Sequence, residues 1–137
     1  MSGFLRLTYL SKACAPMSQS ELKELLDACD ANNAVLGITG VLCAGRGYFL
    51  QALEGMEDSV IEVYSRILKD ARHRDCSLLD IGLIESPLFH DWKMGFVDGT
   101  QLPVNLFTDI LALRSTNNRR EQTKQLLQTF LNRLRGS

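Results

Sequence analysis

Apolar and polar residues alternate along the first part of the chain, from Phe4 to Ser11. A period of two residues is typical of a β-strand. After a short connection, residues 18–21 read Ser-Gln-Ser-Glu, the capping-box pattern with which many helices begin. Apolar residues then recur with helical spacing over residues 22–29. We expect this helix to end near Asn32 and Asn33, because asparagine tolerates the left-handed conformation that often follows a helix.

Two strand-like segments, residues 37–43 and 48–54, lie on either side of the sequence Ala-Gly-Arg-Gly. The glycines of this linker can take positive φ, so we expect the two strands to form a hairpin. A second helix is predicted after Gly55, with acidic residues in its first turn and basic residues at its end, which the helix dipole favours. The basic residues at its end are Lys69, Arg72 and His73.

Two further strands are predicted, over residues 76–84 and, more briefly, over residues 93–97. The order is then strand-helix-strand-strand-helix-strand-strand, which favours an α+β, ferredoxin-like βαββαββ sheet. In that topology both helices lie on one face of the sheet, and the first and third strands are neighbours at its centre.

After Pro103 the chain has two more helical patterns, over residues 104–111 and 126–134. We expect a C-terminal helical pair that packs on the other face of the sheet or on a partner. This divides the chain into a domain over residues 1–100 and a helical extension over residues 101–137.

Composition and charge exclude several classes of protein. The 137 residues suffice for one small domain, and 45% hydrophobic and 23% charged residues are typical of a globular chain. A net charge of −1 argues against a nucleic-acid-binding protein that is basic throughout. No apolar stretch reaches the roughly 18 residues that a membrane helix needs, and the N-terminus lacks the apolar run of a signal peptide. We therefore expect a cytoplasmic protein.

The distribution of charge and of cysteine adds two expectations. Residues 1–113 carry nine Lys and Arg against fifteen Asp and Glu, a net charge of −6, whereas residues 114–137 carry six and one, a net charge of +5. A basic tail on an acidic body could contact an acidic partner, an anionic surface or the body itself. The four cysteines form no CxxC pair and no zinc-like spacing with the two histidines. We expect free thiols and no metal site, with Cys29 in the core.

The third predicted strand places an amide between two large apolar side chains, because Phe49, Gln51 and Leu53 share one face. An unpaired buried amide costs about 1–3 kcal/mol, so Gln51 should have a partner. Tyr9 lies at a comparable depth on the neighbouring central strand, and its hydroxyl could bond to Gln51. The simplest interpretation is a satisfied buried pair without a function.

Other polar and aromatic residues also allow a structural and a functional interpretation. Asn32 and Asn33 suit a helix end, and the basic end of the second helix suits either solvent or phosphate. Trp92 and Met94 alternate in the fifth predicted strand, so both should face the same side, with core packing as the default. Each of these signals is weak by itself.

Taken together, these positions resemble one family, the BLUF domains, which are flavin-based sensors of blue light. The resemblance runs from about Leu5 to Phe96. It is carried by RLTYLS from Arg6, NNAVLGITG from Asn32, YFLQALEG from Tyr48, YSRILKDARH from Tyr64 and DWKM from Asp91. The series is specific, although no single segment is. The chain departs from the family pattern at Ala71, where proline is common, and at Cys43 and Ala44, where the strand end is commonly aromatic.

The resemblance implies that FAD, or FMN as an alternative, is held noncovalently between the two helices. Tyr9 would give an electron and a proton to the excited flavin, and Gln51 would link Tyr9 to the flavin and rearrange by rotation or tautomerisation. Trp92 and Met94 would carry the change into the fifth strand, and the sequence leaves open which of them faces the flavin. The resemblance also implies the other cofactor-binding residues. The apolar walls around the flavin ring would be Leu25, Phe49 and Ile67. Asn33 would form a hydrogen bond with the pyrimidine edge of the ring, Asn32 would lie nearer the ribityl chain, and the residues near the dinucleotide would be Arg66, Asp70, Arg72 and His73.

The resemblance also implies the kind of output. Short members of the family are sensors and not enzymes, signal to a separate partner protein and commonly self-associate. We therefore expect a signalling partner, a homo-oligomer, no membrane and no direct nucleic-acid contact, with the C-terminal helices as the interface. Two alternatives stay open. One is a flavin-dependent redox enzyme that works in the dark, for which His73 is the only candidate base. The other is an RNA-binding module, which needs exposed aromatic residues on a basic sheet.

Overall fold

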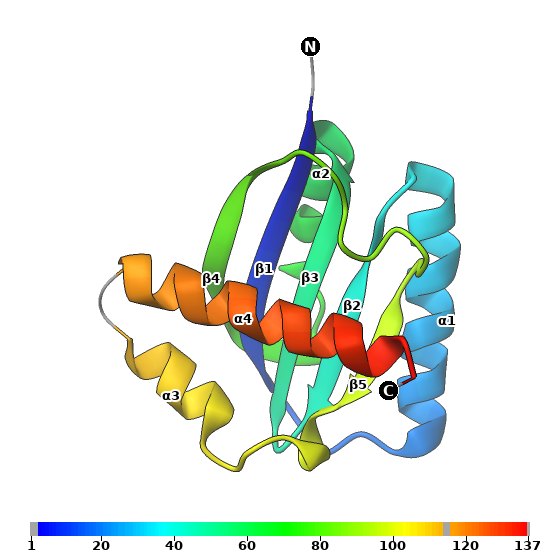
Figure 1. Ribbon diagram of the computed structural model, residues 1–137. Coiled ribbons are helices and arrows are strands. Elements are labelled where there is room, and N and C mark those ends of the chain that lie inside the picture. The colour runs from blue at the N-terminus through cyan, green and yellow to red at the C-terminus, as the bar shows by residue number, and fades with distance from the viewer. Residues whose placement is uncertain (1–2, 114–115, 137) are drawn as a thin grey trace.

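A five-stranded sheet lies at the centre of the molecule, with helices on both faces (Figure 1). This computed structural model describes residues 3–113 and 116–136. The strands are β1 (Phe4–Ala13), β2 (Thr39–Gly45), β3 (Tyr48–Met56), β4 (His73–Ile84) and β5 (Gly95–Asp98). Their order in the sheet is β4-β1-β3-β2-β5, with β5 parallel to β2 and the other neighbours antiparallel. The predicted ferredoxin-like α+β fold, with the first and third strands adjacent, is confirmed.

Each face of the sheet has its own layer of helices and its own apolar core. The helices are α1 (Gln19–Leu36), α2 (Glu57–Ile67), a 3-10 turn η1 (Gly99–Gln101), α3 (Leu106–Ala112) and α4 (Thr116–Leu134). α1 and α2 cover one face, and α4 crosses the other (Figure 1). The core under α1 and α2 contains Leu7, Tyr9 and Leu53, whereas the core under α4 contains Leu10 and Leu50. Alternate side chains of β1 and β3 therefore contribute to the two cores.

The first helix is longer than its sequence pattern predicted. Its start is as expected, because the hydroxyl of Ser18 and the carboxylate of Glu21 each accept the backbone N–H of the other residue. The predicted end is wrong. α1 continues through Asn32 and Asn33 and stops where Gly37 takes a positive φ of 69°. Glycine adopts this conformation at lower cost than asparagine, so both asparagines lie within the helix.

The predicted hairpin is confirmed, with β2 and β3 joined at Arg46 and Gly47. Both residues have positive φ, 54° and 82°. This is the backbone of a type I′ turn, whose twist matches that of the flanking strands. On its other edge, β3 pairs with β1 in a register that places Gln51 opposite Tyr9.

The second helix ends earlier than predicted. Lys69 and Arg72 lie in the connection that follows it, and His73 is the first residue of β4. The carboxylate of Asp70 accepts the backbone N–H of Arg72 at 2.9 Å, which favours a turn over a longer helix. The expected basic helix end is therefore wrong, and Arg66 is the basic residue of the last turn.

The fifth strand begins two residues later than predicted, so Trp92 and Met94 both precede it. The backbone of Trp92 donates to the carbonyl oxygen of Phe89 and accepts from the N–H of Gly40. Because this segment is a loop, its side chains do not follow the alternation of a strand. Met94 lies in the core under α1 and α2, whereas Trp92 packs against the core under α4. The prediction that both face the same side is wrong.

The C-terminal helices pack on the face of the sheet that α1 and α2 leave open, which is one of the two expected placements. The apolar α4 residues buried there are Leu126, Leu127, Phe130 and Leu131. Arg120 of α4 pairs with Asp80 of β4 at 2.8 Å, so part of the basic tail contacts the acidic body itself. No helix in the described part of the chain is long and apolar enough to cross a membrane. The division of the chain at residue 100 stays a prediction.

Removing residues 114–137 is expected to lower the free energy of unfolding by about 6 kcal/mol or more. The truncation takes four apolar side chains of α4 out of the core, and each buried side chain of this kind contributes about 1.5–3 kcal/mol. Urea unfolding of the truncated and full-length chains measures the difference, with a chain that lacks only residues 135–137 as the control. An unchanged unfolding free energy in the long truncation would contradict the core role of α4.

Candidate functional site

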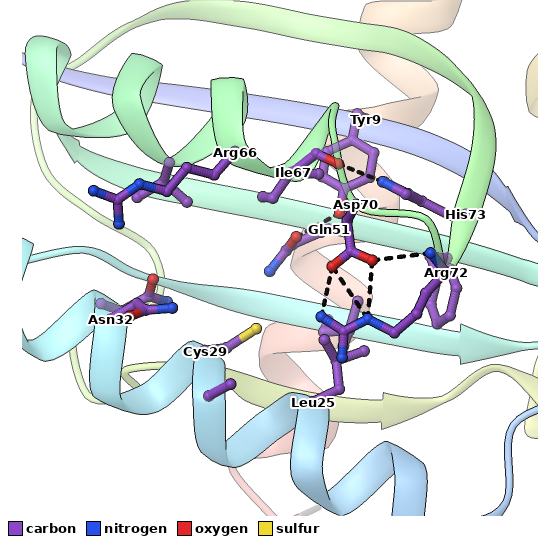
Figure 2. A pocket seen from close by; sticks show the side chains of 15 residues that line it. Tyr9, Leu25, Cys29, Asn32, Gln51, Arg66, Ile67, Asp70, Arg72 and His73 are labelled. Carbon is purple, nitrogen blue, oxygen red and sulfur yellow. Dashed lines mark hydrogen bonds and ion pairs between the residues drawn. The ribbon is translucent and has the colours of Figure 1, made fainter.

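A cavity lies between α1, α2 and the sheet, with a volume of about 800 Å³ that includes its mouth to solvent. Figure 2 shows Leu25, Cys29 and Asn32 of α1 opposite Arg66 and Ile67 of α2. The lining residues are Tyr9, Leu25, Ala28, Cys29, Asn32, Asn33, Leu42, Phe49, Gln51, Val63, Arg66, Ile67, Asp70, Arg72 and His73.

All eleven residues expected to bind the cofactor line this one cavity. Four lining residues were missed, and each has a sequence signal. Ala28 and Cys29 follow Leu25 at helical spacing, Val63 precedes Ile67 by one turn, and Leu42 lies on β2. Cys29, which was expected in the core, is half-buried and lines the cavity.

The central polar contact of the cavity joins Tyr9 and Gln51. The Tyr9 hydroxyl donates to Gln51 Oε1 at 2.5 Å, and each residue is only 3% exposed. The predicted partner of the buried amide is therefore confirmed. Burial raises the pKa of Tyr9 well above its ordinary value, and the Cys76 thiol adds to the rise. Tyr9 is thus a neutral phenol that holds its proton.

The other end of the Gln51 amide contacts Met94. Gln51 Nε2 donates to the Met94 sulfur at 3.4 Å. A thioether sulfur accepts hydrogen bonds and cannot donate, so it selects the NH₂ end of the amide. The Gln51 oxygen is then left to face Tyr9. Met94 thereby orients the amide, although it does not line the cavity.

The end of α1 is joined to the loop before β5 through Asn33. This side chain is 2% exposed, and its Nδ2 atom donates to the carbonyl oxygen of Lys93 at 2.9 Å. Lys93 immediately precedes Met94, so Asn33 and Gln51 bind adjacent residues of one loop. The neighbouring Asn32 lines the cavity from an exposed position.

Charged side chains lie along the rim of the cavity. Arg72 and Asp70 form a forked ion pair with a shortest distance of 2.5 Å (Figure 2). The bonds from Arg72 hold the pKa of Asp70 below its ordinary value. Arg66 lies 3.4 Å from Glu62 on an exposed helix surface. Guanidinium groups in such places can bind phosphate.

His73 contributes its ring to the cavity while both of its nitrogen atoms are bound by protein. Nε2 lies 2.6 Å from the carbonyl oxygen of Ile67, and Nδ1 lies 2.7 Å from the hydroxyl of Ser11. The carbonyl can only accept, so Nε2 carries a hydrogen and donates to it, while Nδ1 is bound to the Ser11 hydroxyl. The ring meets Tyr9 and Phe49 edge-on, with centroids 6.0 and 6.3 Å away. His73 thus connects β1 to the end of α2.

The thiols of the described chain are all free, as the sequence predicted. Burial raises the pKa of Cys29, an effect that Arg72 partly offsets, so the thiol in the cavity stays protonated. The described residues bring together no group of His, Cys, Asp and Glu that could hold a metal ion.

Comparison with known proteins gives a family match over most of this fold. The family model described as "Sensors of blue-light using FAD", BLUF, matches residues 4–95. The photoactivated adenylate cyclase subunit beta of Euglena longa is 42% identical over 94 residues, which are 68% of this chain and 11% of that protein. The chain therefore spans about a tenth of the length of the curated relatives that it matches.

Solved structures show the same architecture beyond the matched segment. The dark-state structure of BlrB, a BLUF protein, has a TM-score of 0.80 at 28% identity and covers 96% of this chain and 98% of that one. The structure of Klebsiella pneumoniae BlrP1 with FMN and cyclic diGMP has a TM-score of 0.70 at 28% identity and covers 94% of this chain and 34% of that one. On the family match and these likenesses, the chain belongs to the BLUF family of flavin-binding blue-light sensors.

Proposed function

We propose that the cavity between α1 and α2 binds FAD noncovalently and that the Tyr9–Gln51–Met94 chain is the light switch. The observation that carries this proposal is the buried hydrogen bond between Tyr9 and Gln51, in which the far end of the amide is oriented by Met94. A chemically inert core would not need a polar chain that runs from the cavity wall into a loop. The switch therefore has an input side at Tyr9 and an output side at Met94.

The side chains present fit a flavin in three respects. Apolar residues from α1, α2 and β3 offer walls for a planar ring. Asn33 uses Nδ2 to bond Lys93, which leaves Oδ1 to accept from an N–H group at the pyrimidine edge of the ring. Arg66 and Arg72 at the rim suit phosphate oxygens. Because two guanidinium groups on different segments suit a diphosphate better than one phosphate, FAD is favoured over FMN.

Bound flavin supplies absorption of blue light and an excited state that accepts an electron. Tyr9 is the donor in this proposal, since its ring lies at the cavity and its hydroxyl proton is already directed along a hydrogen bond to Gln51. Burial keeps the phenol protonated, so a Tyr9 that gave an electron to the flavin would also release its hydroxyl proton along the hydrogen bond to Gln51 Oε1. Both return to Tyr9 when the site relaxes.

Gln51 stores the signal as a changed hydrogen-bond pattern. Rotation of the amide would place Oε1 against the Met94 sulfur, where two acceptors meet, and would break the present bond. Tautomerisation would leave one N–H on the nitrogen and could keep that bond. Met94 therefore opposes rotation more than tautomerisation. In a dry cavity such differences in bonding are larger than in water.

The output leaves through the loop that carries Met94. This loop leads directly into β5, whose first residue, Gly95, approaches the side chain of Leu134 in α4 so closely that an added Cβ would lie 2.5 Å from Leu134 Cδ1. A shift of the loop would therefore push Gly95 against Leu134 and displace the C-terminal helix. We propose a separate signalling protein as the partner and self-association through α3 and α4, with the chain acting as a sensor and not as an enzyme.

The alternative of a redox enzyme that works in the dark needs a free base in the cavity. His73 was the candidate, but its two nitrogen atoms are engaged by Ser11 and Ile67. The carboxylate of Asp70 is engaged by Arg72. These contacts favour a binding and switching role over general base catalysis.

The proposal is tested by purifying the protein in darkness, identifying the flavin that it releases on denaturation, and illuminating the intact protein. We expect one FAD per chain and a small red shift of the flavin band that reverses in darkness. A flavin that bleaches under light would support the enzyme alternative. A colourless protein that refuses added FAD would overturn the proposed binding.

Asn33→Ala is expected to raise the dissociation constant for FAD at least about tenfold, because the flavin ring loses one hydrogen bond and the Lys93 carbonyl loses another. Equilibrium dialysis of the flavin-free protein measures the change. Asn32→Ala is the matched control, since the neighbouring amide is exposed and makes a smaller contribution. Equal losses of affinity in the two variants would contradict the assignment of Asn33.

A further inference from the structure

Glu54 is a fully buried carboxylate that the proposed switch does not use. It lies on β3, three residues after Gln51, and its exposed fraction is 0%. Strand alternation directs it to the face opposite Gln51. A buried charge is costly unless it is paired and hydrogen-bonded. A carboxylate kept in this place therefore needs partners, and their identity indicates what it does.

Three N–H groups bind the Glu54 carboxylate. Arg6, its cross-strand neighbour on β1, donates through Nε to Oε2 at 2.8 Å. The other two donors are backbone groups of one loop, Leu88 N–H to Oε2 at 3.0 Å and Phe89 N–H to Oε1 at 2.8 Å. The Phe89 side chain is fully buried in the core under α4. Glu54 thus fixes the loop between β4 and β5 to the centre of the sheet.

The far end of the same loop carries the output side of the switch. Phe89 is linked to it directly, because its carbonyl oxygen accepts the N–H of Trp92 at 3.0 Å. The Trp92 carbonyl in turn accepts from Gly40 at 3.2 Å. Two residues later, the Met94 sulfur accepts from Gln51. A chain of contacts therefore runs from Glu54 through the loop to the Gln51 amide, although the two side chains lie on opposite faces of β3.

We propose that Glu54 is a positioning residue of the light switch, which holds the loop over residues 85–94 so that the Met94 sulfur meets Gln51. This inference rests on the proposed function. The carboxylate supplies two acceptor oxygens to two adjacent backbone N–H groups, a match that a neutral amide cannot make. When one of these groups loses its partner, the loop moves toward water to satisfy it. Met94 then leaves its place at Gln51.

The test is a double-mutant cycle on the rate at which the illuminated protein returns to its dark spectrum. Glu54→Gln is combined with Met94→Leu, and Glu85→Gln is the matched control, because Glu85 is exposed in the same loop. We expect Glu54→Gln to change the rate about threefold or more in the wild-type background and much less in the Met94→Leu background. Glu85→Gln should leave the rate unchanged. Equal effects of Glu54→Gln in both backgrounds would overturn the inference.

The outcomes for the wild type and for Glu54→Gln distinguish a failure of the proposed function from a failure of the positioning role. If the wild-type protein shows no light-induced shift, the proposed function has failed. If the wild type shifts and Glu54→Gln behaves as Glu85→Gln does, the positioning role alone has failed.

A variant that does not fold leaves a decisive measurement on the wild type, hydrogen exchange at the Leu88 and Phe89 amides. A residue coupled to the switch predicts slow exchange in darkness and a changed rate under blue light. A carboxylate that only stabilises the fold predicts the same slow exchange in both conditions. Equal exchange in darkness and light would therefore overturn the inference without any substitution.

Discussion

Tyr9→Phe is expected to give a protein that binds flavin and shows no red shift in blue light. The substitution removes the hydroxyl and leaves the ring, which packs beside Tyr64 and His73. A phenyl ring has no acidic proton and is much harder to oxidise than a phenol, so the proposed donor is lost. Gln51 Oε1 also loses its hydrogen bond, at a cost of about 1–3 kcal/mol. The light-minus-dark absorption spectrum measures the loss of the red shift, and the flavin content of the same sample measures whether flavin is still bound.

Tyr64→Phe is the matched control. The Tyr64 ring lies 5.7 Å from that of Tyr9, so the same atom is removed close to the cavity without touching the bond to Gln51. This variant should keep the full shift. A full shift in Tyr9→Phe would remove Tyr9 from the mechanism.

Gln51→Leu is the second substitution with a large expected effect. Leucine has a similar volume and suits the apolar neighbours Phe49 and Leu53, so the variant should fold and bind flavin. It has no amide to rearrange, and neither Tyr9 nor Met94 keeps its hydrogen bond. We expect the light-induced shift to disappear. The unpaired Tyr9 hydroxyl should lower the free energy of unfolding by about 1–3 kcal/mol, measured in urea.

Gln101→Leu provides the control for this change of amide to isobutyl. Gln101 is exposed at the end of η1 and does not line the cavity, so its substitution should alter neither the shift nor flavin binding. A reversible red shift in Gln51→Leu equal to that of the wild type would show that the signal is stored elsewhere.

The positions that a strand or helix pattern determines could be predicted from the sequence. Alternation along two strands placed Tyr9 and Gln51 on one face, and the register between β1 and β3 puts them opposite each other. Helical spacing likewise placed Leu25 and Ile67 on the sides of α1 and α2 that face the cavity. These residues lie within regular elements, where local periodicity decides which face a side chain occupies.

The loop before β5 could not be predicted in the same way. Its path depends on contacts with residues far away in sequence, such as Glu54 with Phe89 and Asn33 with Lys93. No local period governs such a segment, so the strand alternation assumed for Trp92 and Met94 wrongly placed both side chains on the same side. The same reason explains His73, whose partners Ser11 and Ile67 come from two other elements. A basic residue near a helix end suggested phosphate, whereas its ring nitrogens bind protein.

The end of α1 at Gly37 could not be predicted from the local sequence either. Asparagine and glycine both suit the end of a helix, and the sequence offers them four residues apart. The buried bond from Asn33 to the Lys93 carbonyl favours the longer helix, because it needs Asn33 on the inner side of α1. That competition is settled by tertiary packing and not by propensity.

In the proposed mechanism, blue light changes the hydrogen bonds of the Gln51 amide. The most direct test is a light-minus-dark infrared difference spectrum of the wild-type protein with isotope-labelled glutamine side chains, with Gln51→Leu as the means of assignment. We predict a label-sensitive amide carbonyl band that changes on illumination, reverses in darkness and is absent from Gln51→Leu. A reversible shift of the flavin band without any label-sensitive change would contradict this role of Gln51.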